Sequence, residues 1–329
     1  MATGVARGRG WLRSRLAAER YAWGVVGYNV LVIVWGALVR ATGSGAGCGN
    51  HWPLCNGQVI PVSPGLHTVI EFTHRSMTGG AAIAVAGLLV LAFRATEKGQ
   101  AARSAAVISA VLLVNEALLG ALLVKLGYVT DNRSLGRVVM LAIHLSNTLL
   151  LLGALTMTAR LLGTGQRWAE MRARRGMRVW AGVGIGATLV VGVSGSLAAL
   201  GDTLFPSESL RSAVAQDFAA GAPWLLRLRW VHPASAVVAA LFVGWLLLKA
   251  RETGAGAAAR TVGVLLLSQF VLGAADVLLL APVWLQLVHL LGADLYWVAL
   301  VLLTAAVVWP AADGRNTEPY LLPTSRSEA

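Results

Sequence analysis

The sequence predicts an all-α polytopic membrane protein with eight transmembrane helices, arranged as two pseudo-symmetric four-helix bundles. Three observations predict this fold class: an apolar composition, eight apolar stretches of spanning length, and a layout that repeats in the two halves. Hydrophobic residues make up 57% of the chain and charged residues 13%, and the mean hydropathy is +0.68, far more apolar than a soluble domain requires. Roughly 20 apolar residues span a bilayer. The expected spans are 21–40, 70–93, 104–124, 138–159, 179–200, 230–248, 261–281 and 284–309.

Basic residues are unevenly distributed between the two sides of these helices. Nineteen lie in the two tails and in the connections on one side, compared with six in the connections on the other. By the positive-inside rule the richer side is cytoplasmic, so we expect a multi-pass plasma-membrane protein with both termini in the cytoplasm. The net charge of +12 then reflects topology and indicates no nucleic-acid partner. The expected segments are a basic cytoplasmic tail (1–20), an N-terminal four-helix half (21–160), a basic cytoplasmic linker (161–178), a C-terminal four-helix half (179–309) and a cytoplasmic tail (310–329).

Two outer connections are long, and the first of them, residues 41–69, contains both cysteines of the chain, Cys48 and Cys55. Disulfides persist on the oxidising side of a membrane, and two cysteines allow one pairing. A disulfide is therefore expected. Two free thiols and one half of a metal site are the alternatives, although no further cysteine is present to complete a cysteine-rich zinc site.

The two halves repeat, and their histidines repeat with them. Each half has a helix, a long outer connection and three further helices. "THRSMTGGAAIAVAGLLVL" of the second helix aligns with "VHPASAVVAALFVGWLLL" of the sixth, and "IHLSNTLLLLGAL" of the fourth with "VHLLGADLYWVAL" of the eighth. His74 thus corresponds to His232, and His144 to His289. Duplication of a four-helix unit explains the pattern.

These four histidines are expected within the first two turns of even-numbered helices, at one depth about 3–10 Å below the outer boundary. Two imidazoles on facing helices of a four-helix unit suit the axial ligation of a haem iron. Hydrogen-bonded core histidines are one alternative. Zinc is another, but it needs further ligands, of which Asp294 near His289 is the main candidate. Two haem sites, one in each half, fit the pattern best.

The halves differ in the ionisable residue that lies three positions before the first histidine of each pair. Glu71 precedes His74 and shares its helix face, whereas Arg229 precedes His232. A carboxylate there can accept protons or stabilise positive charge beside a porphyrin. Arg75 can pair with a haem propionate or with Glu71. The alternative is a Glu–Arg pair that reaches the membrane surface.

Two further acidic residues lie in the middle of predicted spans. Glu116 in the third helix and Asp276 in the seventh sit at comparable places in the two halves. Interhelical hydrogen bonds are the expected role of such residues.

Several segments together resemble the haem A synthase family: "RATGSGAGCGNHWPLC", "EFTHR", "HLSNTLLLL", "GDTLFP" and "VHLLGADLYW". The resemblance covers about 22–309 and is closest to bacterial, actinobacterial-type members with a single cysteine pair in the first outer loop. It implies an eight-helix pseudo-symmetric membrane oxidoreductase. Such an enzyme oxidises a ring methyl group of haem O to a formyl group, giving haem A for terminal oxidase assembly.

The resemblance also implies roles for individual residues. Glu71 is the implied catalytic carboxylate, His74 and His144 flank the substrate haem O, and His232 and His289 ligate a permanent haem b. Haem O synthase is the candidate donor of the substrate. The electron donor or acceptor is not indicated, and a homo-oligomer stays open.

Two other functions share part of this pattern. A di-haem electron-transfer protein would use the same histidines but would not need Glu71 or unequal halves. A haem transporter would need ligands toward the inner side, whereas the candidate ligands lie near the outer one.

Overall fold

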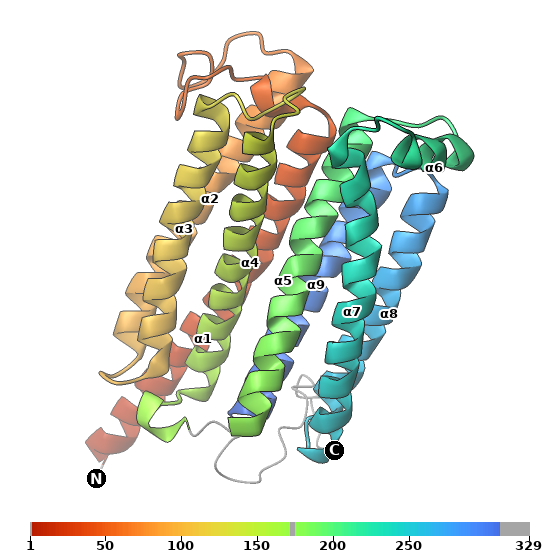
Figure 1. Ribbon diagram of the computed structural model, residues 1–329. Coiled ribbons are helices and arrows are strands. Elements are labelled where there is room, and N and C mark those ends of the chain that lie inside the picture. Colours follow the sequence, from red (N-terminus) through yellow and green to blue (C-terminus); the bar gives the residue numbers. More distant parts are fainter. Residues whose placement is uncertain (1, 172–174, 310–329) are drawn as a thin grey trace, which may run out of the picture.

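The computed structural model describes the backbone of residues 2–171 and 175–309, and these residues fold almost entirely into helices (Figure 1). The expected tail at 310–329 and residues 172–174 of the expected linker lie outside the described residues. The described elements are α1 (Ala2–Ala41), η1 (Ser44–Ala46), α2 (Leu66–Ala95), α3 (Ala101–Lys125), α4 (Leu135–Thr164), η2 (Trp168–Glu170), α5 (Arg175–Leu204), α6 (Leu210–Phe218), α7 (Trp224–Glu252), α8 (Gly256–Leu278) and α9 (Val283–Val308).

Eight of the described helices are long and apolar enough to cross a membrane, which confirms the predicted number of spans. Most of them extend beyond the predicted apolar stretches; α4, expected at 138–159, runs from Leu135 to Thr164. The apolar stretch marks the part inside the bilayer, whereas the helix continues to residues that cap it. Ser134 accepts a hydrogen bond from the backbone N–H of Arg137, and Gly165 ends the helix with a φ of 66°.

The longer helices change the depth of the histidines within their own helices. The prediction of the first two turns is wrong for three of the four. His74, His144 and His232 lie eight or nine residues after the first residues of α2, α4 and α7, while His289 lies six residues after the start of α9. All four still lie in the first third or so of a helix that begins at the same end of the molecule.

The second long connection, expected at 201–229, is partly helical. The helix α5 continues to Leu204, α6 forms from Leu210 to Phe218, and α7 begins at Trp224. Figure 1 shows α6 at the same end of the molecule as the disulfide loop (residues 42–65), opposite the start of α1. We name residues 205–223 the α6 loop.

Contacts between helices form two rings. In the N-terminal half, α1 and α3 each contact both α2 and α4; in the C-terminal half, α5 and α8 each contact both α7 and α9. This pattern is compatible with the two predicted four-helix bundles. The halves meet mainly where α4 contacts α5 and α9 and where α1 contacts α9.

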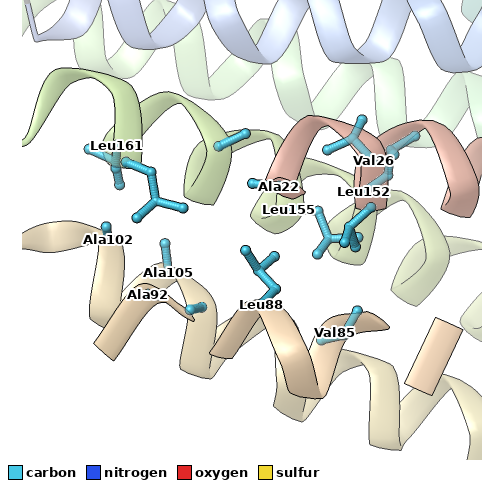
Figure 2. Close-up of a cluster of buried hydrophobic side chains, with 14 of the residues drawn as sticks. Ala22, Val26, Val85, Leu88, Ala92, Ala102, Ala105, Leu152, Leu155 and Leu161 are labelled. Atoms are coloured by element: carbon cyan, nitrogen blue, oxygen red, sulfur yellow. The ribbon is translucent and has the colours of Figure 1, made fainter. Parts of the chain in front are cut away.

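Small and branched side chains fill the core of the N-terminal half (Figure 2). Leu88, Leu152 and Leu155 are fully buried between the helices, and buried alanines such as Ala22 and Ala102 allow close approach. Lipid is as apolar as leucine, so dense packing, rather than removal from water, holds such helices together.

The side chains of Trp297 and Arg40 form polar contacts between the halves. The indole N–H of Trp297 in α9 donates to the carbonyl of Leu149 in α4 at 2.8 Å, and the Trp297 side chain lies within the N-terminal core. Arg40 at the end of α1 donates to the carbonyl of Ala199 at 2.8 Å and to Oε1 of Gln286 at 3.0 Å. The first contact lies in the middle of the helices and the second near the disulfide-loop end.

Replacing Trp297 with phenylalanine should lower stability, because it removes the buried N–H donor while keeping an aromatic ring. The expected loss is about 1 kcal/mol, the usual scale for an interhelical hydrogen bond in a membrane protein. Thermal unfolding in detergent measures it. The matched control is Trp284→Phe on the same helix, whose side chain is exposed. Equal unfolding temperatures for the two variants would contradict the role of the Trp297 contact.

Candidate functional site

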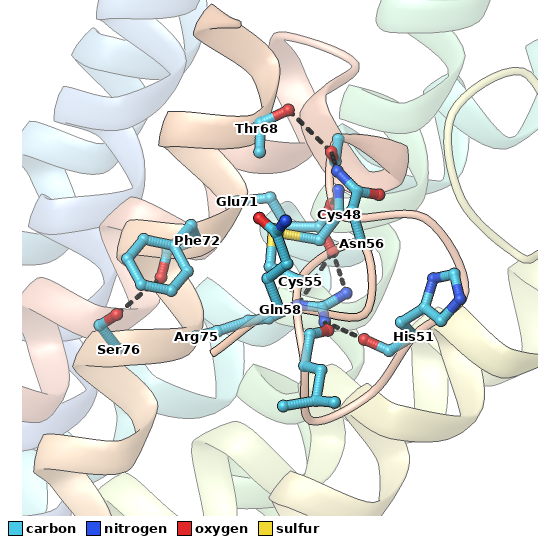
Figure 3. Close-up of a disulfide and its surroundings, with 12 residues drawn as sticks. Cys48, His51, Cys55, Asn56, Gln58, Thr68, Glu71, Phe72, Arg75 and Ser76 are labelled. Atoms are coloured by element: carbon cyan, nitrogen blue, oxygen red, sulfur yellow. Dashed lines mark hydrogen bonds and ion pairs between the residues drawn. A yellow bond between two sulfur atoms is a disulfide. The ribbon is translucent and has the colours of Figure 1, made fainter. Parts of the chain in front are cut away.

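Glu71 is a buried carboxylate in the second turn of α2, only 3% exposed. Its Oε2 atom accepts a hydrogen bond from the backbone N–H of Cys48 at 2.7 Å, and its Oε1 atom accepts from Nη2 of Arg75 at 2.6 Å (Figure 3). Each carboxylate oxygen therefore accepts a hydrogen bond, Oε2 from a buried backbone N–H and Oε1 from a charged guanidinium group. A buried carboxylate requires such partners, because an unpaired charge is costly to bury.

Arg75 connects α2 to the disulfide loop. Its Nη1 atom donates to the carbonyl of His51 at 2.6 Å and to that of Leu54 at 2.5 Å, while Nε and Nη2 face Glu71. The predicted pairing of Arg75 with Glu71 is thus present. Together the two side chains hold the disulfide loop against the first turns of α2.

The predicted disulfide is confirmed: Cys48 and Cys55 are bonded, and both side chains are buried. The bond closes a short loop that lies beside Glu71 (Figure 3). Thr68 supplies another contact, since its hydroxyl donates to the carbonyl of Gly47 at 2.8 Å.

In the C-terminal half, Arg229 occupies the position that Glu71 has in the N-terminal half. It forms ion pairs with Asp202 at 2.9 Å and with Asp217 of α6 at 3.1 Å. It also donates to the carbonyls of Gly201 and Phe205. In both halves the residue three positions before the histidine holds a loop, but the charge is opposite.

Each of the four histidines packs against a glycine on an adjacent helix. A methyl group added to the glycine would lie within van der Waals distance of the histidine Cε1 atom or closer. The pairs, with the distance from that Cβ to Cε1, are Gly195 and His232 at 2.8 Å, Gly36 and His74 at 3.0 Å, Gly273 and His289 at 3.4 Å, and Gly120 and His144 at 3.8 Å.

His232 and His289 face each other across the C-terminal half. Their ring centroids are 6.3 Å apart, and the rings are nearly perpendicular at 82°. His232 Nδ1 lies 3.2 Å from the carbonyl oxygen of Val191 and 3.4 Å from Oγ of Ser194, which leaves Nε2 for another partner. Because a metal–nitrogen bond to histidine is about 2 Å long and the ring centre lies about 1 Å further on, two imidazoles on opposite sides of one metal have centroids about 6 Å apart. The observed separation is therefore one at which His232 and His289 could both bind one metal ion.

The N-terminal pair has different surroundings. His74 Nδ1 is buried without a hydrogen-bond partner. His144 Nδ1 lies 3.4 Å from Oε1 of Glu116, within ion-pair distance but outside hydrogen-bond geometry. Among the residues whose side chains are described, no group of three or more His, Cys, Asp or Glu is placed to hold a metal ion.

Sequence reasoning found the histidines and Glu71 but missed the glycines that face them. The signal was present in the repeat: V-x-G occurs at 34–36 and at 193–195, and L-G-A at 119–121 and at 272–274. No sequence pattern indicated the hydrogen bond from the Cys48 N–H to Glu71, because this bond depends on the path of the folded loop.

The chain is similar to known proteins over most of its length. Residues 19–301 match the family described as cytochrome oxidase assembly protein (COX15-CtaA). A protein of Thermus thermophilus named protoheme IX farnesyltransferase is 42% identical over 299 residues, which are 90% of this chain and 49% of that protein. The chain thus spans about half the length of that relative.

Proteins of Bacillus cereus and Bacillus anthracis named heme A synthase are 42% identical to this chain over 98 residues, which are 30% of the chain and 32% of each relative. The family match covers far more than half of the sequence and agrees with the resemblance seen in its motifs. The chain therefore belongs to the cytochrome oxidase assembly protein family, which is the family of the haem A synthases.

Proposed function

We propose that this protein is a haem A synthase, which oxidises one ring methyl group of haem O to a formyl group. The observation that carries the proposal is the unequal chemistry of two otherwise matching halves. Three residues before the first histidine, the N-terminal half has the buried carboxylate of Glu71 and the C-terminal half has Arg229. A protein that only transferred electrons between two haems would not need this difference.

The proposed resident cofactor is haem b in the C-terminal half, held by His232 and His289. Their 6.3 Å centroid separation supports this assignment. Haem b, when bound, supplies a one-electron redox centre. The substrate haem O is assigned to the N-terminal half, where His74 and His144 flank it.

Glu71 is the proposed catalytic residue. Successive hydroxylations of a methyl carbon withdraw electrons from it and release protons, so a nearby carboxylate can accept a proton or stabilise developing positive charge. Burial strengthens that interaction, because the charge is poorly screened. The loop held by Glu71 and Arg75 covers this carboxylate and limits the access of water.

Arg75 is the proposed partner of a haem propionate. A guanidinium group has five N–H donors. Four of them are directed at Glu71, His51 and Leu54 in this structure, which leaves one N–H of Nη2 for a propionate oxygen. The side chain would then link the substrate to the loop above it.

Replacing Glu71 with glutamine should abolish most haem A formation while haem b and haem O remain bound. The amide keeps an oxygen that can accept from Cys48 but loses the negative charge, so the expected fall in the haem A to haem O ratio is at least about 100-fold. The ratio is measured in extracted pigments, with haem b absorbance as the control for folding.

The matched control for this test is Thr68→Val, which removes a different contact between α2 and the disulfide loop. It should leave the ratio close to that of the unmodified protein. A similar loss in both variants would show that Glu71 acts only by holding the loop. A normal ratio in Glu71→Gln would favour the electron-transfer alternative.

The membrane placement and the substrate donor are also proposals. We place the protein in the plasma membrane with both termini in the cytoplasm, because basic residues are concentrated on that side. Haem O synthase is the proposed donor of haem O. A relative named for protohaem IX farnesyl transfer contains, within about half of its length, a region similar to nearly this whole chain, which supports a close link between the two activities.

The topology can be tested with reporters at two positions. A fusion after Arg315 should be active only in the cytoplasm, and an insertion in the α6 loop should be active only outside it. The reason is the asymmetry of nineteen basic residues against six. The reverse pattern would put the disulfide on the cytoplasmic side and contradict the assignment.

Replacing Gly195 with alanine should disturb haem b binding, because the new methyl group would lie 2.8 Å from His232 Cε1. Haem b content of the purified protein should fall several-fold, toward that of His232→Ala. Gly120→Ala, with a 3.8 Å contact, should change haem content little. Gly186→Ala on the same helix as Gly195 meets nothing within 4 Å and is the control. Full haem b in Gly195→Ala would show that the ring is free to move.

A further inference from the structure

We infer that Glu116 is a positioning residue for His144, an inference that rests on the proposed placement of haem O in the N-terminal half. Glu116 lies in the middle of α3 and faces α4. Its Oε1 atom is 3.4 Å from His144 Nδ1. That nitrogen is buried and has no hydrogen-bond partner.

The carboxylate is held in place from α4 itself. Nδ2 of Asn147 donates to Oε2 of Glu116 at 2.6 Å, and the hydroxyl of Thr148 contacts Oε1 at short distance. Asn147 and Thr148 follow His144 by three and four residues, so all three side chains share one face of α4. Asn115 extends the set by donating to Oδ1 of Asn147 at 2.8 Å.

This arrangement orients the imidazole. With Nδ1 next to the carboxylate, Nε2 is the nitrogen left to face the haem. Carboxylates that accept from the second nitrogen of a metal-ligating histidine fix its ring orientation, and their loss typically weakens metal binding about 10- to 100-fold. At 3.4 Å the two atoms are close enough for a hydrogen bond but are not aligned as donor and acceptor, so a rotation of the ring completes the bond.

The C-terminal half provides a natural comparison. Glu116 lies four residues before Gly120, which packs against His144. Gln269 lies four residues before Gly273, which packs against His289. Gln269, rather than Asp276, is therefore the structural counterpart of Glu116.

The polar partners are missing at the corresponding positions of that half. Gly292 and Ala293 stand three and four residues after His289, where the N-terminal half has Asn147 and Thr148. Both polar atoms of the Gln269 amide are buried without a partner, and so is Nδ1 of His289. Among the described residues, the hydrogen-bonded carboxylate next to the second histidine of the pair is thus found only in the proposed substrate half.

Two roles for Glu116 make different predictions. An interhelical tie alone, as the sequence suggested, would need only the hydrogen bonds with Asn147 and Thr148. A positioning role requires the carboxylate next to His144 Nδ1. Asn147→Leu weakens the tie and keeps the carboxylate, whereas Glu116→Gln removes the charge and keeps an amide that can still bond Asn147.

The test uses the full chain, purified in detergent with haem b bound and titrated with haem O. Glu116→Gln should weaken haem O binding about tenfold and shift the electron paramagnetic resonance signal of the ferric haem O, without changing the haem b signal. Asn147→Leu should lower the unfolding temperature but leave the haem O signal in place. Unchanged haem O affinity and signal in Glu116→Gln would overturn the inference.

A second variant covers the case in which Glu116→Gln loses haem b and is therefore unfolded. Glu116→Asp keeps the charge but shortens the side chain by one methylene group, which takes the carboxylate out of reach of Nδ1. It should keep haem b and show the shifted haem O signal; an unshifted signal overturns the inference. These binding readouts are separate from haem A formation by the unmodified protein, whose absence would refute the proposed function instead.

Discussion

The packing of each histidine against a glycine is the contact on which both halves depend. A methyl group at Gly195 or Gly36 would push the ring from the position it now has, whereas at Gly273 or Gly120 it would only come into ordinary van der Waals contact with the ring. Helices that meet through small residues can approach closely in lipid, where dense packing is the main source of association. The same close approach therefore brings the helices together and fixes the direction of each imidazole.

The two halves share these glycine–histidine contacts but differ in the charge of a residue near the first histidine of each pair. The residue one turn before the first histidine holds a loop in each half, through a carboxylate at Glu71 and a guanidinium at Arg229. The loops differ accordingly: one is closed by a disulfide, and the other contains α6 with its acidic Asp217. A duplicated four-helix unit can thus keep the contacts between its helices while the charged residues and loops at one end of each copy become different. The polar groups around Glu116 extend this difference to the middle of the helices.

Much of this could be predicted from sequence, because composition and spacing carry it. The apolar stretches gave the eight spans, the repeat gave the histidine pairs, and the cysteine count gave the disulfide. The predicted helices begin too late in the sequence. Hydropathy identifies the residues inside the bilayer, whereas a helix begins where its first backbone hydrogen bond forms. Glu116 was paired with Asp276 by its place along the span, but the register of the glycines pairs it with Gln269. The bond from Cys48 to Glu71 depends on a folded loop, which no local pattern describes.

The position of Trp297 has a consequence for how the protein is made. Trp297 and Val301 belong to the last described helix, yet they complete the core of the first four. A ribosome releases α1 to α4 into the membrane well before α9 exists. Until then the carbonyl of Leu149 lacks its indole donor, and the core of the first half lacks two of its side chains. The first half therefore reaches its final packing only after α9 has been made, although all of its own helices have long been in place.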